Sequence, residues 1–125
     1  MLLSIDAASE RPIYAQLADA VRRAVARGEL RVGEKLPPAG EVAIGLGVNK
    51  HTVLRAYQEL RDEGLVDLRR GRGAVITSLA DEIALLRRDA ARIAERARGL
   101  GVSPRTLAAL LQIPSPTRSD EGRTA

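Results

Sequence analysis

The chain has 125 residues, 45% of them hydrophobic, so it is long enough to bury one core and carry a small additional element. It has no cysteine, which excludes disulfides, thiol catalysis and cysteine-based zinc sites. No apolar run approaches the roughly 20 residues that cross a bilayer, and no signal peptide is visible at the N-terminus, so we expect a cytoplasmic protein without a membrane partner. The net charge of +4 favours a polyanionic partner. The only aromatic residues are Tyr14 and Tyr57. Proteins that bind single-stranded nucleic acid stack the bases on several aromatic side chains, so among polyanions this composition favours double-stranded DNA.

The first expected helix follows a short N-terminal arm, residues 1–10. Pro12 opens it, and an apolar stripe at helical spacing continues to Gly28, through Ile13, Leu17, Ala20, Val21, Ala24 and Val25. Glycines and prolines between Gly28 and Pro38 predict an ordered loop, anchored to the core by Leu30, Val32 and Leu36.

Two helices joined by a glycine turn are expected next. The first runs from about Gly40 to Leu46, Gly47 makes the turn, and Asn49 is placed to cap the second helix. Four residues of that second helix fall on one stripe and form its buried face: Val53, Ala56, Tyr57 and Leu60. The opposite face presents His51, Arg55 and Gln58 to a partner, with Lys50 and Leu54 on its shoulder. Because both tyrosines lie on apolar stripes, we interpret them as core residues rather than ligands.

A hairpin with a basic tip follows this helix. Gly64 ends the helix, and β-prone segments on either side flank the tip, Arg69-Arg70-Gly71-Arg72-Gly73. A helix-turn-helix followed by such a hairpin is typical of a winged helix-turn-helix. The alternative interpretation is an ordinary charged hairpin tip without a partner.

The last segment shows a heptad seam. Its spacings alternate between four and three residues through Leu79, Ile83, Leu86, Ala90, Ile93, Ala97 and Leu100, while Arg87, Arg88 and Arg92 are expected in solvent on the other face. Ser103 and Pro104 open another helix, whose apolar edge is Leu107, Leu110 and Leu111. A helix pair has only one shared face, so we expect a homodimer to cover the remaining apolar side chains; the alternative is packing within the chain.

These elements predict a mostly α fold with a small β-hairpin: a winged helix-turn-helix domain over residues 11–77 followed by a two-helix dimerisation region over residues 79–112. The segment from 113 to 125 contains two prolines and no apolar pattern, so we expect a disordered tail.

Five separated motifs occur in the order and spacing of a known family. They are Pro12-Ile13-Tyr14-Ala15-Gln16-Leu17, the segment Gly28 to Pro37, Thr52-Val53 with Ala56-Tyr57 and Leu60, Glu63-Gly64-Leu65-Val66, and Arg70-Gly71-Arg72-Gly73. Together they resemble the GntR family of bacterial transcription regulators, and the short helical C-terminal part resembles its YtrA subfamily.

The resemblance implies a dimeric repressor that inserts one helix into the major groove of double-stranded DNA and lays the wing against the minor groove. The residues implied for the major groove are Asn49, Lys50, His51, Thr52 and Arg55, and those for the wing are Arg69, Arg70, Gly71 and Arg72. Lys35 and Leu54 are further candidates for contacts to the DNA backbone; for Leu54 the alternatives are a thymine methyl group and packing within the chain. The side chains suit these roles, since Lys50 can donate to guanine and the Thr52 hydroxyl to a phosphate.

Departures from the family pattern concern three positions. Pro38 replaces a helix-capping serine, Gly40 replaces a DNA-contacting arginine, and Leu54 stands where many relatives have a further arginine. We expect Leu54 to pack against the chain, and we expect DNA binding to depend more strongly on the wing arginines than in relatives.

The leading hypothesis is a sequence-specific regulator, most simply a repressor on a pseudo-palindromic operator near its own promoter. The alternative is a winged-helix adapter that binds another protein. With one histidine, no phosphate loop, no metal-ligand spacing and no recognisable pair of nucleophile and base, the sequence does not indicate an enzyme, a cofactor or a metal. By analogy with the YtrA subfamily, we expect a small-molecule effector of unknown identity to act on the angle between the DNA-binding domains through the segment near Ser78.

Overall fold

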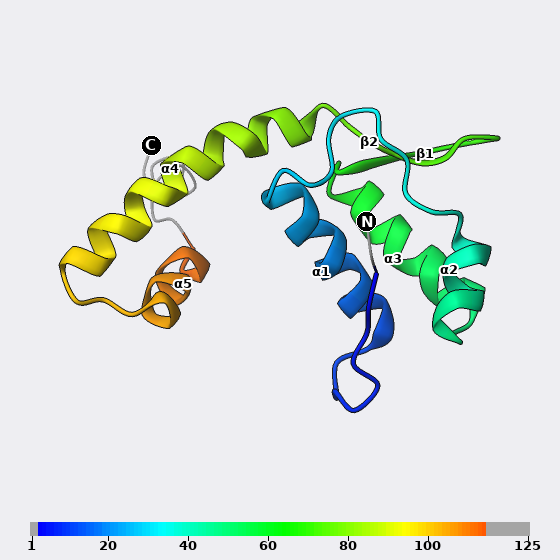
Figure 1. The fold of residues 1–125 in the computed structure, drawn as a ribbon, viewed down its shortest axis with the longest axis horizontal. Coiled ribbons are helices and arrows are strands. Elements are labelled where there is room, and N and C mark those ends of the chain that lie inside the picture. Colours follow the sequence, from blue (N-terminus) through cyan, green and yellow to red (C-terminus); the bar gives the residue numbers. More distant parts are fainter. Residues whose placement is uncertain (1–2, 115–125) are drawn as a thin grey trace, which may run out of the picture. The chain divides into compact units, whose positions relative to one another are not determined.

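The computed structural model describes residues 3–114, which form five helices and one two-stranded hairpin. The elements in chain order are α1 (Ile13–Ala26), α2 (Ala39–Leu46), α3 (Lys50–Asp62), β1 (Val66–Arg69), β2 (Gly73–Ile76), α4 (Leu79–Gly99) and α5 (Pro104–Gln112) (Figure 1). The fold is mostly α with a small hairpin, as the sequence predicts. It divides into two compact units, one ending at Arg87 and one beginning at Arg88.

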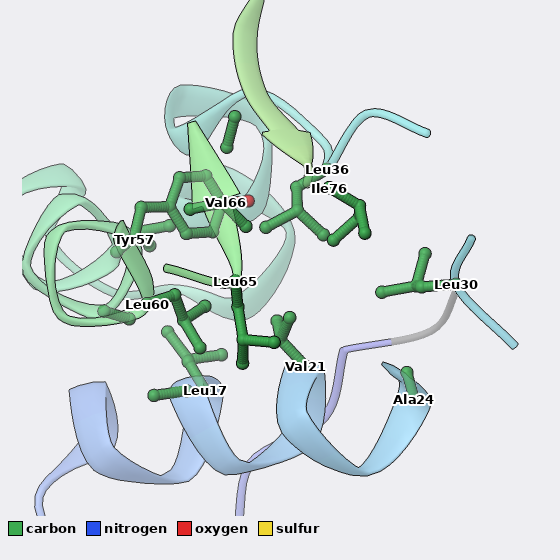
Figure 2. Close-up of a cluster of buried hydrophobic side chains, with 14 of the residues drawn as sticks. Leu17, Val21, Ala24, Leu30, Leu36, Tyr57, Leu60, Leu65, Val66 and Ile76 are labelled. Carbon is green, nitrogen blue, oxygen red and sulfur yellow. The ribbon is translucent and has the colours of Figure 1, made fainter. Parts of the chain in front are cut away.

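The core of the first unit forms where α1, α3 and the hairpin turn their apolar stripes toward one another (Figure 2). All four residues predicted for the inner face of α3 are buried. Leu60 has no exposed surface and packs in the same cluster as Leu17 and Val21 of α1. Truncation of such a leucine to alanine costs about 2–5 kcal/mol, because the cavity that it leaves collapses only partly.

The turn between α2 and α3 follows the expected chemistry. Gly47 adopts the left-handed conformation with φ of 68°, which a glycine accepts without strain. The side chain of Asn49 then accepts a hydrogen bond of 2.8 Å from the backbone N–H of His51 and caps α3. By contrast, α2 begins after Pro38 with no side-chain cap.

A third strand segment pairs with the hairpin, which sequence reasoning missed. Strands β1 and β2 are antiparallel with Val66 opposite Ile76, and Lys35 forms a further antiparallel bridge to Val75. The backbone N–H of Leu36 donates to the carbonyl of Ala74 at 2.8 Å. The glycines and prolines around this segment hid it, because a single bridged residue leaves no periodic pattern.

The loop before that bridge is anchored by fewer residues than predicted. Leu30 and Leu36 are buried, but Val32 is 42% exposed, so its predicted anchoring role is wrong. Gly33 at φ of 86° lies next to Val32, and its N–H donates to the Ile76 carbonyl at 2.8 Å. Backbone pairing therefore holds this part of the loop without burial of the valine.

The first turns of α4 belong to the first compact unit, which ends at Arg87 and is called the winged-helix unit below. Leu79 and Ile83 are partly buried against its core, and Ala80 is buried. The first two residues of the predicted seam, Leu79 and Ile83, are therefore covered by packing within the chain. The boundary between the two compact units lies after Arg87, further along the chain than the segment near Ser78 where a hinge is expected.

In the second unit, the end of α4 leads into α5 through a turn at Gly101, where φ is 79°. The N–H of Val102 donates to the carbonyl of Ala97 at 2.9 Å, and Ser103 caps α5 by accepting from the N–H of Thr106 at 3.2 Å. Ala97 is buried and Leu107 is half-buried, so the seam is covered here in part.

No helix within residues 3–114 is long and apolar enough to cross a membrane. Of the predicted tail, residues 115–125 lie outside the described residues.

Candidate nucleic-acid interface

The outward face of α3 presents the side chains that the sequence predicted. Because Val53, Ala56, Tyr57 and Leu60 are buried, Lys50, His51, Arg55 and Gln58 are left in solvent. Thr52 is half-buried one turn from the capped N-terminus, where backbone N–H groups and the helix dipole favour an anion. Leu54 is half-buried and packs against the core, as the packing interpretation expects.

The basic side chains on this face have no acidic partner in the described part of the chain. Lys50, His51 and Arg55 form no ion pair within 4.0 Å among residues 3–114. The charges of Lys50 and Arg55 are therefore available to a polyanion, whereas Arg61 at the far end of the helix contacts Asp62 at 3.2 Å. Pairing with a phosphate would not require an existing ion pair to break.

The wing is the hairpin of β1 and β2, and the turn at its tip is tight. Gly71 has φ of 80°, and the N–H of Arg72 donates to the carbonyl of Arg69 at 3.0 Å across the turn. Arg70 and Arg72 are exposed and have no ion pair among residues 3–114. Arg69 differs, because its guanidinium lies 3.4 Å from the carboxylate of Asp67. The three wing arginines are thus not equivalent.

Lys35 joins the wing through its backbone bridge to Val75, and its side chain is exposed. Lys35 is also a candidate from the sequence for contacts to the DNA backbone, and the bridge places it beside β2 of the hairpin.

Helix α2 contributes no positive charge. It contains Glu41 in its first turn and no basic residue, and no heavy atom outside the helix backbone lies within 4 Å of the position that a Cβ at Gly40 would occupy. A side chain can therefore leave the backbone at this position without a clash at its first atom.

Tyr57 links α3 to the start of α2. Its hydroxyl donates to the carbonyl oxygen of Pro37 at 2.5 Å, directly before the uncapped helix. Burial raises the pKa of Tyr57 to about 12, because the phenolate would lose hydration. The group is a neutral donor that fixes the distance between the two helices.

An ion network joins α1 to α3 on another side. Arg22 contacts Glu63 at 2.6 Å, Glu59 at 3.1 Å and Asp19 at 2.7 Å. The pKa of Arg22 is raised, chiefly by the hydrogen bond to Glu63. Burial alone would raise the pKa of Asp19, but hydrogen bonds from Arg11 and Arg22 outweigh it and lower this pKa below its usual value.

One contact on the candidate interface was invisible to sequence reasoning. The guanidinium carbon of Arg55 lies 3.7 Å from the centroid of the Tyr14 ring. Both residues were singled out separately, Tyr14 as a core residue and Arg55 as a DNA contact. Only the crossing of α1 over α3 brings them together, and no periodicity reports such a crossing.

Comparison with known proteins agrees with this geometry. The family model described as bacterial regulatory proteins, gntR family, matches residues 13–76, from the first residue of α1 to the last residue of β2. The chain belongs to the GntR family. Two individual proteins are also similar. The HTH-type transcriptional repressor YtrA of Bacillus subtilis is 37% identical over 79 residues, which cover 63% of this chain and 61% of that protein. YtrA from Sulfolobus acidocaldarius, a GntR-family transcription factor of known structure, is 37% identical with a TM-score of 0.57, covering 74% of this chain and 99% of that one.

A domain in complex with an operator is also similar. The DNA-binding domain of AraR in complex with operator ORX1 is 27% identical with a TM-score of 0.53, over 60% of this chain and 93% of that one. Relatives and fold are those of transcription regulators rather than enzymes. The matched segment spans about three fifths of the length of the curated Bacillus subtilis relatives.

Proposed function

We propose that this GntR-family protein is a sequence-specific regulator that binds double-stranded DNA as a homodimer and represses transcription from a pseudo-palindromic operator. The observation that carries the proposal is the set of exposed cations on two successive elements that have no acidic partner among residues 3–114: Lys50 and Arg55 on α3, beside the exposed His51, and Arg70 and Arg72 on the wing. Family membership and the operator complex of a similar domain support DNA binding. Repression is proposed from the name of the Bacillus subtilis relative.

Base reading is assigned to Lys50, His51 and Arg55, because side chains near the start of a recognition helix reach base edges in the major groove. Asn49 holds the helix terminus, and Thr52 is placed for a backbone phosphate. The wing arginines and Lys35 supply phosphate or minor-groove contacts, with Gly71 allowing the backbone to approach closely.

The homodimer is proposed from apolar side chains that the described chain leaves in solvent. On the seam of α4, Leu86 is 62% exposed and Ile93 is 47% exposed, while Ala90 between them is also exposed. On α5, Leu110 and Leu111 are exposed. A second copy with the same seam buries these side chains and places two recognition helices on half-sites roughly 34 to 36 Å apart, about one helical turn of DNA.

Footprinting tests the DNA-binding part. A labelled fragment from the upstream region of the protein's own gene should show two protected half-sites, and binding should be at least tenfold tighter than to random duplex of equal length. Equal affinity for both would contradict sequence-specific regulation.

Charge reversal separates a DNA regulator from a protein-binding adapter. Arg70→Glu with Arg72→Glu should flatten the slope of log affinity against log salt by about 2, since each lost phosphate contact removes about 0.9 from the slope. The control is Arg27→Glu with Arg31→Glu, which changes net charge equally at exposed positions in the loop after α1. If both pairs have the same effect, the wing has no special role.

Sedimentation tests the assembly. Ile93→Glu should convert a dimer to a monomer at micromolar concentration, whereas Ala91→Glu, an exposed position off the seam of the same helix, should leave the dimer intact. A wild-type chain that sediments as a monomer at every concentration contradicts the homodimer.

A further inference from the structure

The contact between Tyr14 and Arg55 places a partly buried aromatic ring against a long side chain on the exposed face of α3. Tyr14 lies in the first turn of α1, is half-buried, and packs against the hydrophobic core. Arg55 projects from the exposed face of α3 with its guanidinium carbon 3.7 Å from the ring centroid. Core packing immobilises the ring, so the ring restricts the arginine and not the reverse.

Stacking restrains Arg55 without consuming its hydrogen-bonding capacity. A guanidinium carries five N–H donors in its own plane, and an aromatic ring engages the face of that plane. No carboxylate among residues 3–114 lies within 4.0 Å of Arg55 to compete for those donors. The donors stay available for a guanine edge or a phosphate, while the side chain has already lost much of its rotational freedom.

We propose that Tyr14 is a positioning residue for operator recognition, whose ring holds the Arg55 guanidinium in the conformation that binds DNA. This inference rests on the proposed function, since it takes Arg55 to contact the operator. Preordering a long side chain before binding reduces the conformational entropy lost in the complex, and this gain appears as affinity. A restrained guanidinium also approaches base edges from a narrower range of directions, which sharpens discrimination between sequences.

Two other roles for Tyr14 make different predictions. If its hydroxyl contacted a phosphate directly, Tyr14→Phe would weaken binding as much as removal of the ring. If the ring only filled space beside α3, its loss would weaken binding whether or not Arg55 were present. The stacking role requires the ring, does not require the hydroxyl, and acts only through Arg55.

A double-mutant cycle on the full chain tests the proposal, with affinities measured for the footprinted operator and for random duplex of equal length. Tyr14→Leu should weaken operator binding about threefold to tenfold, as expected for one cation–π contact. Tyr14→Phe should stay within about twofold of wild type, because phenylalanine keeps the face of the ring. In the Arg55→Ala background, Tyr14→Leu should cause no further loss.

A measurement on the free protein keeps the proposal testable if Tyr14→Leu does not fold. The aromatic ring current should shift the Arg55 side-chain protons upfield in wild type and in Tyr14→Phe. Absence of that shift in wild type overturns the stack.

The outcomes separate this inference from the proposed function. No preference of wild type for the operator over random duplex refutes the proposed function itself. With that preference present, the inference alone fails if Arg55→Ala binds like wild type, if Tyr14→Phe is as impaired as Tyr14→Leu, or if the two losses add independently.

Discussion

The guanidinium of Arg87 donates a hydrogen bond of 2.9 Å to the carbonyl oxygen of Ala26, the last residue of α1. Sixty-one positions separate the two residues in the chain. A cation at the carboxyl end of a helix satisfies a carbonyl without an intrahelical partner and interacts favourably with the helix dipole. This contact holds the start of α4 on the winged-helix unit, and Arg87 is exposed, as the sequence predicts.

We expect Arg87→Ala to lower the free energy of unfolding by about 0.5–1 kcal/mol, because one exposed charge-assisted hydrogen bond is lost. Urea unfolding measures this, and hydrogen exchange should become faster in the first two turns of α4. Arg88→Ala is the matched control, an exposed arginine one position further along. Equal losses in the two variants would mean that the contact to Ala26 adds nothing.

Tyr57→Phe should lower the free energy of unfolding by about 1 kcal/mol, since the Pro37 carbonyl loses its donor while the ring stays buried. The pKa raised to about 12 adds a pH signature. A pKa above its unfolded value of about 10 means stability that is fully present below pH 10 and lost as pH rises through 12. Urea unfolding of wild type and variant between pH 8 and pH 12 should therefore show their difference shrink at the alkaline end. A constant difference would place its origin elsewhere than the hydroxyl.

Helical elements followed from the sequence because their apolar spacing is a local property. The inner face of α3, its cap at Asn49 and the glycine turn at Gly47 were each predicted from residues less than three turns apart. The contacts that sequence reasoning missed join distant segments: Lys35 to Val75, Tyr14 to Arg55, and Arg87 to Ala26. Each of these contacts depends on how two elements pack across one another, and the spacing of apolar residues within one element carries no information about that packing.

The seam of α4 shows the same limit. Its heptad spacing correctly marked a helix with one apolar face, yet the pattern did not reveal that Leu79 and Ile83 pack on the winged-helix core while Leu86 and Ile93 remain exposed. A repeat specifies which side chains share a face, and the chain around it decides what covers that face.

Gly40→Arg should strengthen DNA binding. A Cβ at this position meets nothing within 4 Å, and an arginine would add a cation to a helix that has none. We expect about threefold to tenfold tighter operator binding at low salt and a salt slope steeper by about 0.9, the signature of one phosphate contact. Gly40→Ala is the control, because it adds helix propensity of up to about 1 kcal/mol without charge. If alanine tightens binding equally, stability of α2 and not the charge is responsible.

Acid should remove the contribution of Asp19. Arg11 and Arg22 contact its carboxylate at 2.6 and 2.7 Å and hold its pKa below the usual 3.8. A depressed pKa means stability that is present above the unfolded pKa and lost as pH falls through the folded one. Asp19→Asn should therefore be less stable than wild type at pH 7, with the gap closing below pH 3.8. Thermal unfolding at both pH values measures this, with Asp62→Asn, which contacts only the adjacent Arg61, as control.

Asp67 limits the charge of the wing. Its carboxylate lies 3.4 Å from Arg69, on the strand that leads to the tip, and it adds a negative charge where phosphates would approach. Since both side chains are more than half exposed, the pair contributes little to folding, and its loss should leave the unfolding midpoint unchanged. Asp67→Asn frees Arg69 and removes the repulsion, so operator affinity should rise about twofold to fivefold at low salt and converge with wild type at high salt. Fluorescence anisotropy over a salt series measures both, and Glu82→Gln on α4 removes an equal charge away from the wing. Weaker binding by Asp67→Asn would show instead that the carboxylate orients Arg69 for its DNA contact.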